Sequence, residues 1–542
     1  MIHPADRPLS TPPSIRRVLG GGPFAEIGKP TVAVPDEAHG LVAVGGSVGN
    51  LSWPGRYVDG WHGHRVGVHG LDDLGCRLLV RSRWPVLDLA FHPHLPLLAV
   101  GTGAYDGGWF YEGELLLVDL ESGATVSALE YPREVRRVDW REDGRALRLA
   151  LAPHDDEDDE SPETHGFAVT VERDDWRAVA DRTVLSTEQV GPRVEAPHRP
   201  DGVKEAAREL LTALAAEQGI AWHPRRRVWA VEELSDGRVL AALEGVKLES
   251  RLPSGELEWS VPDPDGGCEL SVAPDQRSAW VNLARTARWI PGSGWVDAPG
   301  AVERLSLADG ATLAVAEVAH PVTLTAATDG RIALRDTRND RPKTPTVLLA
   351  PERPQSAGPV LGGYDARNNW FGVRRSPELL FLQGKKKKYW KDKWVVAVDP
   401  EGDGRGEVRR LFPLAWDTDR AGHLFGGPAV RLDGALVHAG QVHHGSGLQP
   451  GHAFIVRRRF PDGLPQWVFT GDHLVTALDT DGTTVFAALT SGEILALDAA
   501  DGTQRWRTRL TVDGIPTVAL SLTVPGPGRL LLGTVDGRIL LT

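Results

Sequence analysis

One short segment of the chain concentrates positive charge and aromatic rings. Residues 384–394 read GKKKKYWKDKW and hold six of the ten lysines in the sequence. Cations beside stacking rings suit a phosphate backbone with exposed bases, an acidic protein or an anionic surface. The alternative is a solvated hairpin tip whose tryptophans pack back onto the sheet. The candidate partner-binding residues are Lys385, Lys386, Lys387, Lys388, Tyr389, Trp390, Lys391, Lys393 and Trp394.

Histidines gather in two places, which raises the question of a metal site. His62, His64 and His69 lie in WHGHRVGVHG, and four more histidines lie between residues 438 and 452. Residues 62 and 64 would share one face of a strand, a spacing that metal ligands can use. No cysteine or carboxylate within either group completes a ligand set. We therefore expect structural histidines, with no metal and no cofactor.

No set of residues for covalent catalysis stands out. Gly45 to Gly49 reads GGSVG and matches G-x-S-x-G after a strand, but a nucleophile elbow needs a helix immediately afterwards. Residues 50–55, NLSWPG, cannot start one. The sequence also lacks a phosphate-binding P-loop, an H-E-x-x-H motif and a C-x-x-C pair. We expect a protein that is not an enzyme, with no catalytic residues to assign.

The composition narrows the class of protein. The chain has 542 residues, a formal net charge of −13, 61 glycines and 40 prolines. Many glycines and prolines punctuate short elements, as in an all-β chain with many turns. The negative charge argues against a general nucleic-acid binder. The N-terminus has no apolar signal region and no window is apolar enough to span a membrane, so we expect a cytoplasmic protein. Arginine far outnumbers lysine, a bias typical of high-GC bacteria.

Strand–turn–strand units recur along the chain. Val475 to Leu489, VTALDTDGTTVFAAL, has two apolar runs of strand length around a turn of Asp and Gly. A second signature joins two strands through Asp or Ser and Gly, as in Gly492 to Leu510, GEILALDAADGTQRWRTRL, and Gly113 to Leu129, GELLLVDLESGATVSAL. Glycine supplies the positive φ that such turns require.

These units resemble the β-propeller repeat superfamily. The turns at Phe91-His92-Pro93, Trp222-His223-Pro224 and Val272-Ala273-Pro274-Asp275 look like those of WD40 blades. The segment 492–510, with Trp506 after its turn, is similar to a quinoprotein-like repeat, and Trp467 and Trp259 look like the same tryptophan in other blades. The resemblance implies structural repeats and not a quinone cofactor site.

The resemblance implies an all-β fold of four-stranded blades. We expect one closed propeller of seven or eight blades over residues 1–542, or alternatively two smaller propellers. Because about nine candidate units are present, we assign those between residues 321 and 412 to one decorated blade. The chain ends on two strands, so an N-terminal strand near residues 14–19 is expected to close the last blade.

Three insertions interrupt the repeats. Residues 153–165 contain the acidic run DDEDDE, which we expect to be a solvated loop. Residues 201–219 have apolar side chains at helical spacing, with Asp201 as a possible cap and Gly219 as a stop. The third insertion is the basic-aromatic loop 384–394.

The sequence therefore indicates a non-catalytic interaction scaffold or recognition subunit of a bacterial multi-protein system. The expected partners are other proteins of a complex, without a membrane. One alternative is an enzyme with its site in the propeller funnel, such as a hydrolase, a lyase or a metal-dependent oxidoreductase. Another is a nucleic-acid-sensing subunit that uses the loop of lysines and tryptophans.

Overall fold

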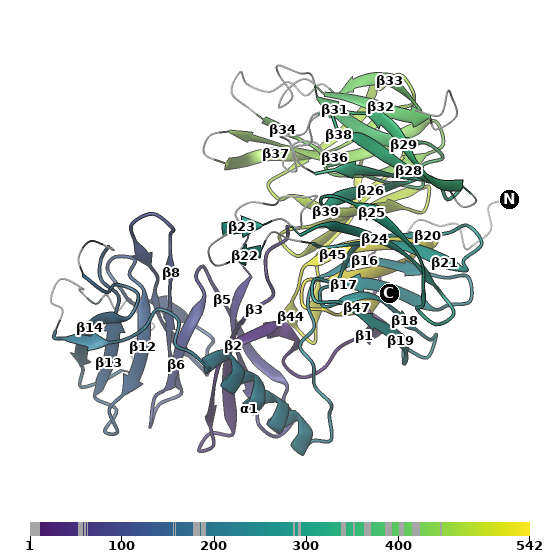
Figure 1. Ribbon diagram of the computed structural model, residues 1–542. Coiled ribbons are helices and arrows are strands. Elements are labelled where there is room, and N and C mark those ends of the chain that lie inside the picture. Colours follow the sequence, from purple (N-terminus) through teal and green to yellow (C-terminus); the bar gives the residue numbers. More distant parts are fainter. Residues whose placement is uncertain are drawn as a thin grey trace. The chain divides into compact units, whose positions relative to one another are not determined.

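A computed structural model describes residues 11–52, 58, 61, 63–155, 157, 159–176, 185, 191–285, 288–290, 294–296, 298–337, 343–350, 353–362, 370–384, 393–399, 406–414, 423–444 and 447–542. The described part is all-β apart from one α-helix and a 3-10 turn, and most strands belong to four-stranded antiparallel sheets (Figure 1). No helix in these ranges is long and apolar enough to cross a membrane.

The chain divides into two compact units. The first comprises residues Met1–Gly20, Leu51–Trp61 and Arg227–Thr542, and the second comprises Gly21–Asn50 and His62–Arg226. The sequence predicts a single propeller over residues 1–542. That expectation and the structure differ because a repeat pattern shows that sheets exist and does not show which sheets pack against one another.

Besides the two-stranded pairs β22–β23 (Arg288–Ile290, Gly294–Val296) and β43–β44 (Thr511–Val512, Ile515–Pro516), the described residues of the first unit form seven larger sheets. In chain order they are β16–β19 (Val228–Glu233, Val239–Leu243, Val246–Arg251, Leu257–Pro262), β20, β21, β24 and β25 (Gly267–Val272, Ser278–Leu283, Gly300–Ser306, Thr312–Val318), β26–β29 (Val322–Ala326, Ile332–Asp336, Pro345–Ala350, Arg353–Val360), β31–β33 (Leu379–Gly384, Lys393–Asp399, Glu407–Leu414), β35–β38 (Pro428–Leu432, Ala435–His444, Gly447–Arg459, Pro465–Gly471), β39–β42 (Val475–Thr480, Thr484–Leu489, Glu493–Asp498, Gln504–Arg509) and β45–β47 (Ala519–Gly526, Arg529–Thr534, Ile539–Leu541) with β1 (Arg17–Leu19).

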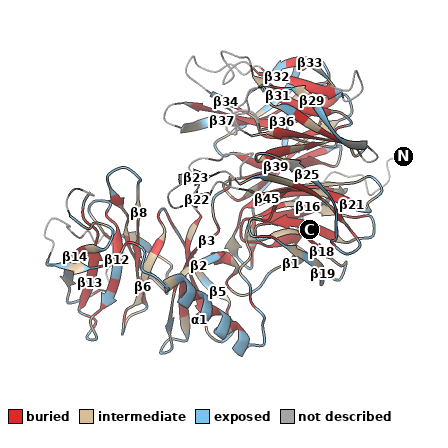
Figure 2. Ribbon diagram, viewed as in Figure 1, coloured by how far each residue is buried: buried red, intermediate tan, exposed pale blue. Residues whose placement is uncertain are grey.

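These seven sheets close into a β-propeller. Each sheet shares a buried apolar cluster with the next one, and a further cluster joins the last sheet to the first. A middle strand is therefore covered on both faces, which explains why β40 reads TVFAAL and is buried throughout. Figure 2 shows that buried residues concentrate in the strands of the sheets. The sequence predicts seven or eight blades over residues 1–542, whereas the ring of the first unit has seven. The segment 321–412, expected to form one decorated blade, forms two sheets instead.

The N-terminal strand completes the last blade. Arg17, Val18 and Leu19 of β1 pair antiparallel with Leu541, Leu540 and Ile539 of β47. Leu19 is 4% exposed and joins the cluster between the last and first sheets. Strands from opposite ends of the chain thus close the ring. The strand predicted near residues 14–19 corresponds to β1.

Besides the two-stranded pair β8–β9 (Ala104–Tyr105, Tyr111–Glu112), the described residues of the second unit form three four-stranded sheets and the α-helix. The sheets are β2–β5 (Lys29–Asp36, Leu41–Ser47, His64–Gly70, Cys76–Ser82), β6, β7, β10 and β11 (Val86–Phe91, Leu97–Thr102, Leu115–Asp119, Thr125–Ser127) and β12–β15 (Val135–Trp140, Ala146–Leu151, His165–Glu172, Arg193–Glu195). One apolar cluster joins the first and second of these sheets, and another joins the second and third.

Helix α1 (Val203–Glu217) lies where the sequence predicts it, beside β2 (Figure 1). Ala207, Leu211 and Ala215 are its buried residues, one on each successive turn. The helix begins after Gly202 in a left-handed conformation, without a side-chain cap from Asp201. It ends before Gly219, whose φ of +73° is typical of a glycine that follows a helix.

The tryptophan of the quinoprotein-like repeat packs between blades. Trp467 lies on β38, and its indole nitrogen donates to the carbonyl oxygen of Ala499, in the turn of the next blade, at 3.1 Å. Gly502 closes that turn with a φ of +77°, and a Cβ there would stand 2.7 Å from the Trp467 ring. Trp259 and Gly310 form the same pair in another blade. The Asp-Gly turn and the tryptophan are thus the two sides of one inter-blade contact.

Candidate functional site

The interior of the propeller holds a cavity of about 150 Å³. It is lined by residues of β16, β20, β26, β35, β39 and β45 and by residues 370–374. A volume of this size holds a few water molecules or a very small ligand. The titratable side chains among the described lining residues are Cys268, Glu269 and Arg374.

A short extra strand crosses the interior beside this cavity. β30 (Gly372–Arg374) pairs in parallel with β35, and Arg374 donates to Glu232 of β16 at 2.7 Å and to Thr523 of β45 at 3.1 Å. Arg375 binds both carboxylate oxygens of the fully buried Asp479 at 2.6 and 2.9 Å. These contacts tie four sheets together, so part of the funnel is filled by the chain itself.

Glu269 is the chemically distinctive residue of the cavity. Burial raises its pKa to about 7, although Asn282 Nδ2 and the backbone nitrogen of Leu324 each donate to its Oε2 at 2.7 Å. The neighbouring Cys268 donates to the carbonyl oxygen of Asn282 at 3.3 Å, and burial raises its pKa well above the usual value. A protonated, buried thiol is a poor nucleophile. Glu269 could exchange a proton near neutral pH, but the described lining residues place no activated nucleophile beside it.

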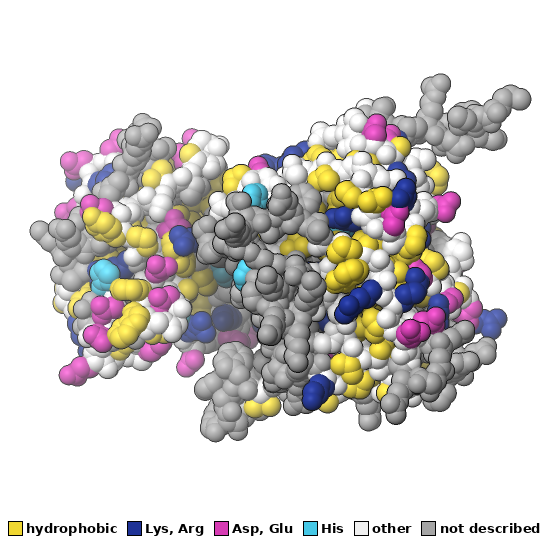
Figure 3. Space-filling model, turned by 90° about the horizontal axis from the view of Figure 1, so that it is seen from above, with side chains coloured by type: hydrophobic (Ala, Val, Ile, Leu, Met, Phe, Trp, Pro, Cys, Tyr) yellow, Lys and Arg dark blue, Asp and Glu magenta, His cyan; other side chains and the backbone are white. Residues whose placement is uncertain are grey.

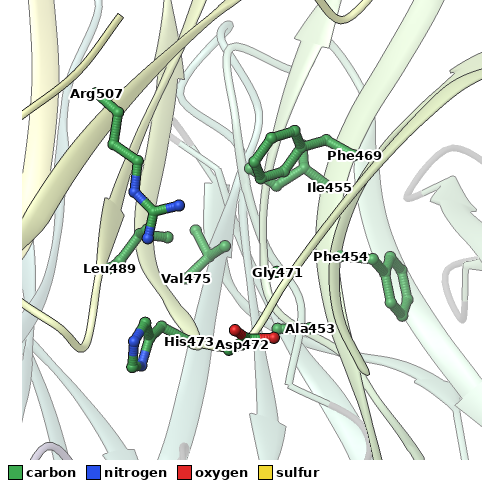
Figure 4. Close-up of a pocket in the computed structure, with 10 residues that line it drawn as sticks. All are labelled: Ala453, Phe454, Ile455, Phe469, Gly471, Asp472, His473, Val475, Leu489 and Arg507. Carbon is green, nitrogen blue, oxygen red and sulfur yellow. The ribbon is translucent and has the colours of Figure 1, made fainter. Parts of the chain in front are cut away.

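A second, smaller cavity of about 20 Å³ lies between the sheets of β35–β38 and β39–β42 (Figure 4). Its walls include Ile455, Val475 and Leu489, and the Arg507 guanidinium at its edge is bound by Glu493 at 2.6 and 2.8 Å. The space holds about one water molecule. We interpret it as a packing gap between blades.

The predicted basic-aromatic loop is only partly described by the structure. Lys385, Lys386, Lys387, Lys388, Tyr389, Trp390 and Lys391 lie outside the described residues. Lys393 is 1% exposed within β32, and Trp394 packs against the cluster between two blades with the Arg410 guanidinium 5.7 Å from its ring. These two residues belong to the fold rather than to an accessible loop, because the strand begins before the lysine run has ended.

Two histidines of the second group, His438 and His443, have structural surroundings. Burial lowers the pKa of His438 to about 3, and its Nε2 accepts a hydrogen bond from Arg458 at 3.1 Å. The His443 ring stacks on Phe425 at 4.4 Å. In the first group, His62 lies outside the described residues, and His69 is fully buried.

The serine of the G-x-S-x-G match has a structural contact. The hydroxyl oxygen of Ser47 accepts a hydrogen bond from the backbone N–H of Gly49 at 3.0 Å.

The acidic run is ordered in part by one ion pair. Arg193 Nε and Nη2 donate to the two carboxylate oxygens of Asp159 at 2.7 and 2.9 Å, and the side chain of Asp159 is 5% exposed. Asp155 forms an isolated β-bridge with Phe110. Glu157 and Glu160 are exposed, as expected for a solvated loop.

The Phe110 bridge leads to a feature that the sequence analysis missed, an aromatic hairpin. The connection between β7 and β10 carries two extra strands, β8 (Ala104–Tyr105) and β9 (Tyr111–Glu112). At its tip Trp109 is 56% exposed and Phe110 is 42% exposed. The signal that could have found it is YDGGWFY, a turn of Asp and Gly flanked by aromatic residues.

The tip of this hairpin is held in one conformation. Asp106 Oδ1 accepts the backbone N–H groups of Gly108, Trp109 and Phe110 at 2.7, 2.9 and 3.1 Å. These hydrogen bonds keep the pKa of Asp106 below its usual value. The Tyr105 hydroxyl donates to the Gly108 carbonyl oxygen at 2.8 Å. The two exposed rings are therefore carried by a pre-ordered turn.

The base of the hairpin is anchored by a buried polar cluster. Tyr111 is 2% exposed, and the Arg136 guanidinium lies 4.9 Å from its ring centre. Arg136 Nε donates to Glu134 at 2.6 Å, and the second oxygen of Glu134 lies 2.7 Å from Nδ1 of His198. Burial is the main cause of the raised pKa of Tyr111. The hairpin thus has a rigid base and an exposed apolar tip.

The face drawn in Figure 3 has no single-sign charged field. Lys and Arg side chains are interspersed with Asp and Glu side chains and with hydrophobic ones. A nucleic-acid interface requires a continuous basic surface. On this face the described residues do not form one.

Among comparisons with known proteins, those with solved structures give matches. No family model matches the chain, and no curated protein matches it. Among solved structures, BamB from Moraxella catarrhalis is similar over 58% of this chain and 97% of that chain, with 14% sequence identity and a TM-score of 0.37.

Proposed function

We propose that this chain is a non-catalytic recognition subunit that binds another protein through the tip of the β8–β9 hairpin. The observation that carries the proposal is the pair of exposed rings, Trp109 and Phe110, on a turn fixed by Asp106. Exposed aromatic side chains are typical anchors of protein interfaces. The backbone that carries them is already held in the free protein, which lowers the entropic cost of binding.

The surroundings of the tip indicate the chemistry of the partner. Glu112 lies at the base of the hairpin, and Asp155 is bridged to Phe110 in the adjoining acidic run with Glu157 nearby in sequence. An apolar pocket with lysine or arginine residues at its rim would complement an aromatic tip among carboxylates. Such binding would weaken as ionic strength rises, because rim charges are screened by salt.

A pull-down from an extract of the organism that makes the protein tests this proposal. Wild type should retain a defined protein that the double variant Trp109→Ala/Phe110→Ala loses. Leu464→Ala is the matched control, because Leu464 is 54% exposed in the other unit. The proposal fails if the double variant retains the same proteins as wild type, or if wild type retains none.

One observation favours a second candidate function, a small-molecule site in the propeller cavity. Glu269, with a pKa of about 7, faces a space of about 150 Å³ and is the residue that would hold a polar ligand. Glu269→Gln would abolish such binding and leave hairpin-dependent capture intact.

The nucleic-acid alternative stays a prediction for the lysine loop. Single-strand binding that is lost in Trp390→Ala would support it.

A further inference from the structure

A buried imidazole nitrogen in the second unit has no hydrogen-bond partner within the described part of the chain. His69 of β4 is fully buried, and its Nδ1 lies 3.3 Å from the carbonyl oxygen of Leu74. A carbonyl can only accept, so Nδ1 carries the hydrogen and Nε2 presents its lone pair. Nε2 is buried, and none of the residues that the structure describes forms a hydrogen bond with it. Burial also lowers the pKa of His69 to about 4, which keeps the ring neutral at pH 7.

Two further donor groups stand beside this imidazole. Glu26, His69 and Cys76 each offer one ligand atom, and these three atoms all lie within 4.8 Å of one another. His69 and Cys76 are directly opposite each other in the β4–β5 pair, so the hairpin register brings them together. Glu26 comes from the 3-10 turn η2 (Ala25–Ile27), where Arg65 Nη1 donates to its backbone oxygen at 2.7 Å.

We propose that Glu26, His69 and Cys76 form a binding site for a divalent transition-metal ion. Zn²⁺ is the ion whose preferred donor types match these three residues best. A carboxylate oxygen, an imidazole nitrogen and a thiolate sulfur are the donor types that zinc takes in proteins. When the ion binds, the Cys76 thiol loses its proton to solvent and the S–H bond is replaced by a metal–sulfur bond. Three protein donors leave a fourth position for water or another group.

The groups around His69 resemble those around metal-bound histidines in other proteins. The Nδ1–H of such a histidine usually donates to a carbonyl or carboxylate, which fixes the ring and the tautomer, and Leu74 supplies that carbonyl here. The Phe24 ring packs edge-on at 4.9 Å from the His69 ring. A Cβ at Gly67 would stand 2.6 Å from His69 Nε2, so the glycine keeps the space beside this nitrogen open.

The position of the site predicts a structural role for the ion. Leu74, Ile27 and Phe24 belong to one apolar cluster with Leu211 and Ala215 of α1. An ion held by η2, β4 and β5 would link three elements beneath the helix. This role is independent of the hairpin, so failure of one proposal leaves the other standing.

The test uses the full chain, stripped with a chelator and then titrated with Zn²⁺ or Co²⁺. Wild type should bind about one ion per chain, and Co²⁺ should produce a thiolate-to-metal charge-transfer absorption. Cys76→Ser should lose this absorption and weaken Zn²⁺ binding by about tenfold or more. Cys268→Ser is the matched control, because Cys268 is the other cysteine of the chain and lies in the first unit. This variant should behave as wild type.

A second variant keeps the proposal falsifiable if Cys76→Ser unfolds. Glu26→Gln should weaken Zn²⁺ binding yet retain the charge-transfer absorption at saturating Co²⁺, because the thiolate remains. The proposal is overturned if wild type binds no Zn²⁺ and gives no cobalt absorption. It is also overturned if Cys268→Ser, and not Cys76→Ser, removes the absorption.

Discussion

The backbone N–H of Trp109 donates to the carboxylate of Asp106 at 2.9 Å, so the exposed indole is positioned by a residue three places before it. The same oxygen holds the two flanking N–H groups. One carboxylate therefore fixes the backbone of the turn that carries both rings that we propose to contact a partner.

Asp106→Ala should loosen the hairpin tip without unfolding the unit, because three backbone donors lose their acceptor at an exposed turn. Hydrogen exchange followed by mass spectrometry should show faster exchange in a peptide covering residues 106–112. Asp481→Ala is the control, since Asp481 holds a similar turn at Thr483 and Thr484 in the other unit. Unchanged exchange at the hairpin would show that Asp106 does not order it.

The inter-blade pair of Trp467 and Gly502 predicts a strong effect of one added methyl group. Gly502→Ala places a Cβ 2.7 Å from the indole and should lower the free energy of unfolding of the first unit by about 1–3 kcal/mol beyond the cost of its positive φ. Gly514→Ala is matched in φ, at +81° against +77°, with nothing within 4 Å. It should lose about 1–2 kcal/mol. Equal losses in a denaturant titration would contradict the role of the tryptophan.

Closure of the ring by β1 predicts that Leu19 is critical and its neighbour is not. Leu19→Ala removes a side chain from the cluster between the last and first blades and should cost about 2–4 kcal/mol. Val18→Ala, at a position 37% exposed, should cost less than about 1 kcal/mol. Unfolding can be followed through the exchange of peptides from β45–β47. A cost for Leu19→Ala as small as that for Val18→Ala would mean that the ring does not need this clasp.

Glu269 predicts a pH dependence of stability with a definite sign. Its pKa is raised by burial from 4.5 to about 7, so the folded chain keeps a proton that the unfolded chain has released. Stability of the wild type should therefore fall between about pH 4.5 and pH 7, by up to about 3 kcal/mol from this residue. Glu269→Gln cannot release the proton, so its unfolding free energy relative to wild type should rise across the same window. Parallel curves for the two proteins would show that Glu269 titrates normally.

Much of the fold follows from local sequence. Short apolar runs around Asp-Gly turns predict the blades, because a tight turn needs a glycine with positive φ and a buried middle strand needs apolar residues on both faces. Gly502 and β40 show both effects. The helix at 203–217 was equally predictable from its apolar spacing, although its first turn is preceded by Gly202 rather than capped by Asp201.

The grouping of blades was not predictable in this way. The chain forms β1 of the propeller, then the three sheets of the second unit, and then returns at β16. Every sheet has the same local sequence pattern, so the pattern does not show which sheet is the neighbour of β16. Packing against the last blade, and not against the preceding sheet β12–β15, places β16 in the ring. The repeat units that lie outside the seven-bladed ring belong to this second unit.

The candidate sites were even less predictable from the sequence, because tertiary contacts bring their residues together. Glu26 and His69 are far apart in sequence, and the β4–β5 register is what brings His69 opposite Cys76. The lysine run drew attention because charge is visible in a sequence, yet Lys393 is buried. The exposure of Trp109 could not be read from its type, since Trp467 and Trp506 are buried.

Site-specific photo-crosslinking at position 109 tests the central claim most directly. A photoreactive phenylalanine analogue replaces Trp109 in the full chain, and the same analogue at position 464 serves as the control. Our account predicts a crosslink from position 109 to one protein that position 464 does not capture, and the loss of that crosslink when Asp106→Ala is added. No protein crosslinked at position 109, or the same proteins captured from both positions, would contradict it.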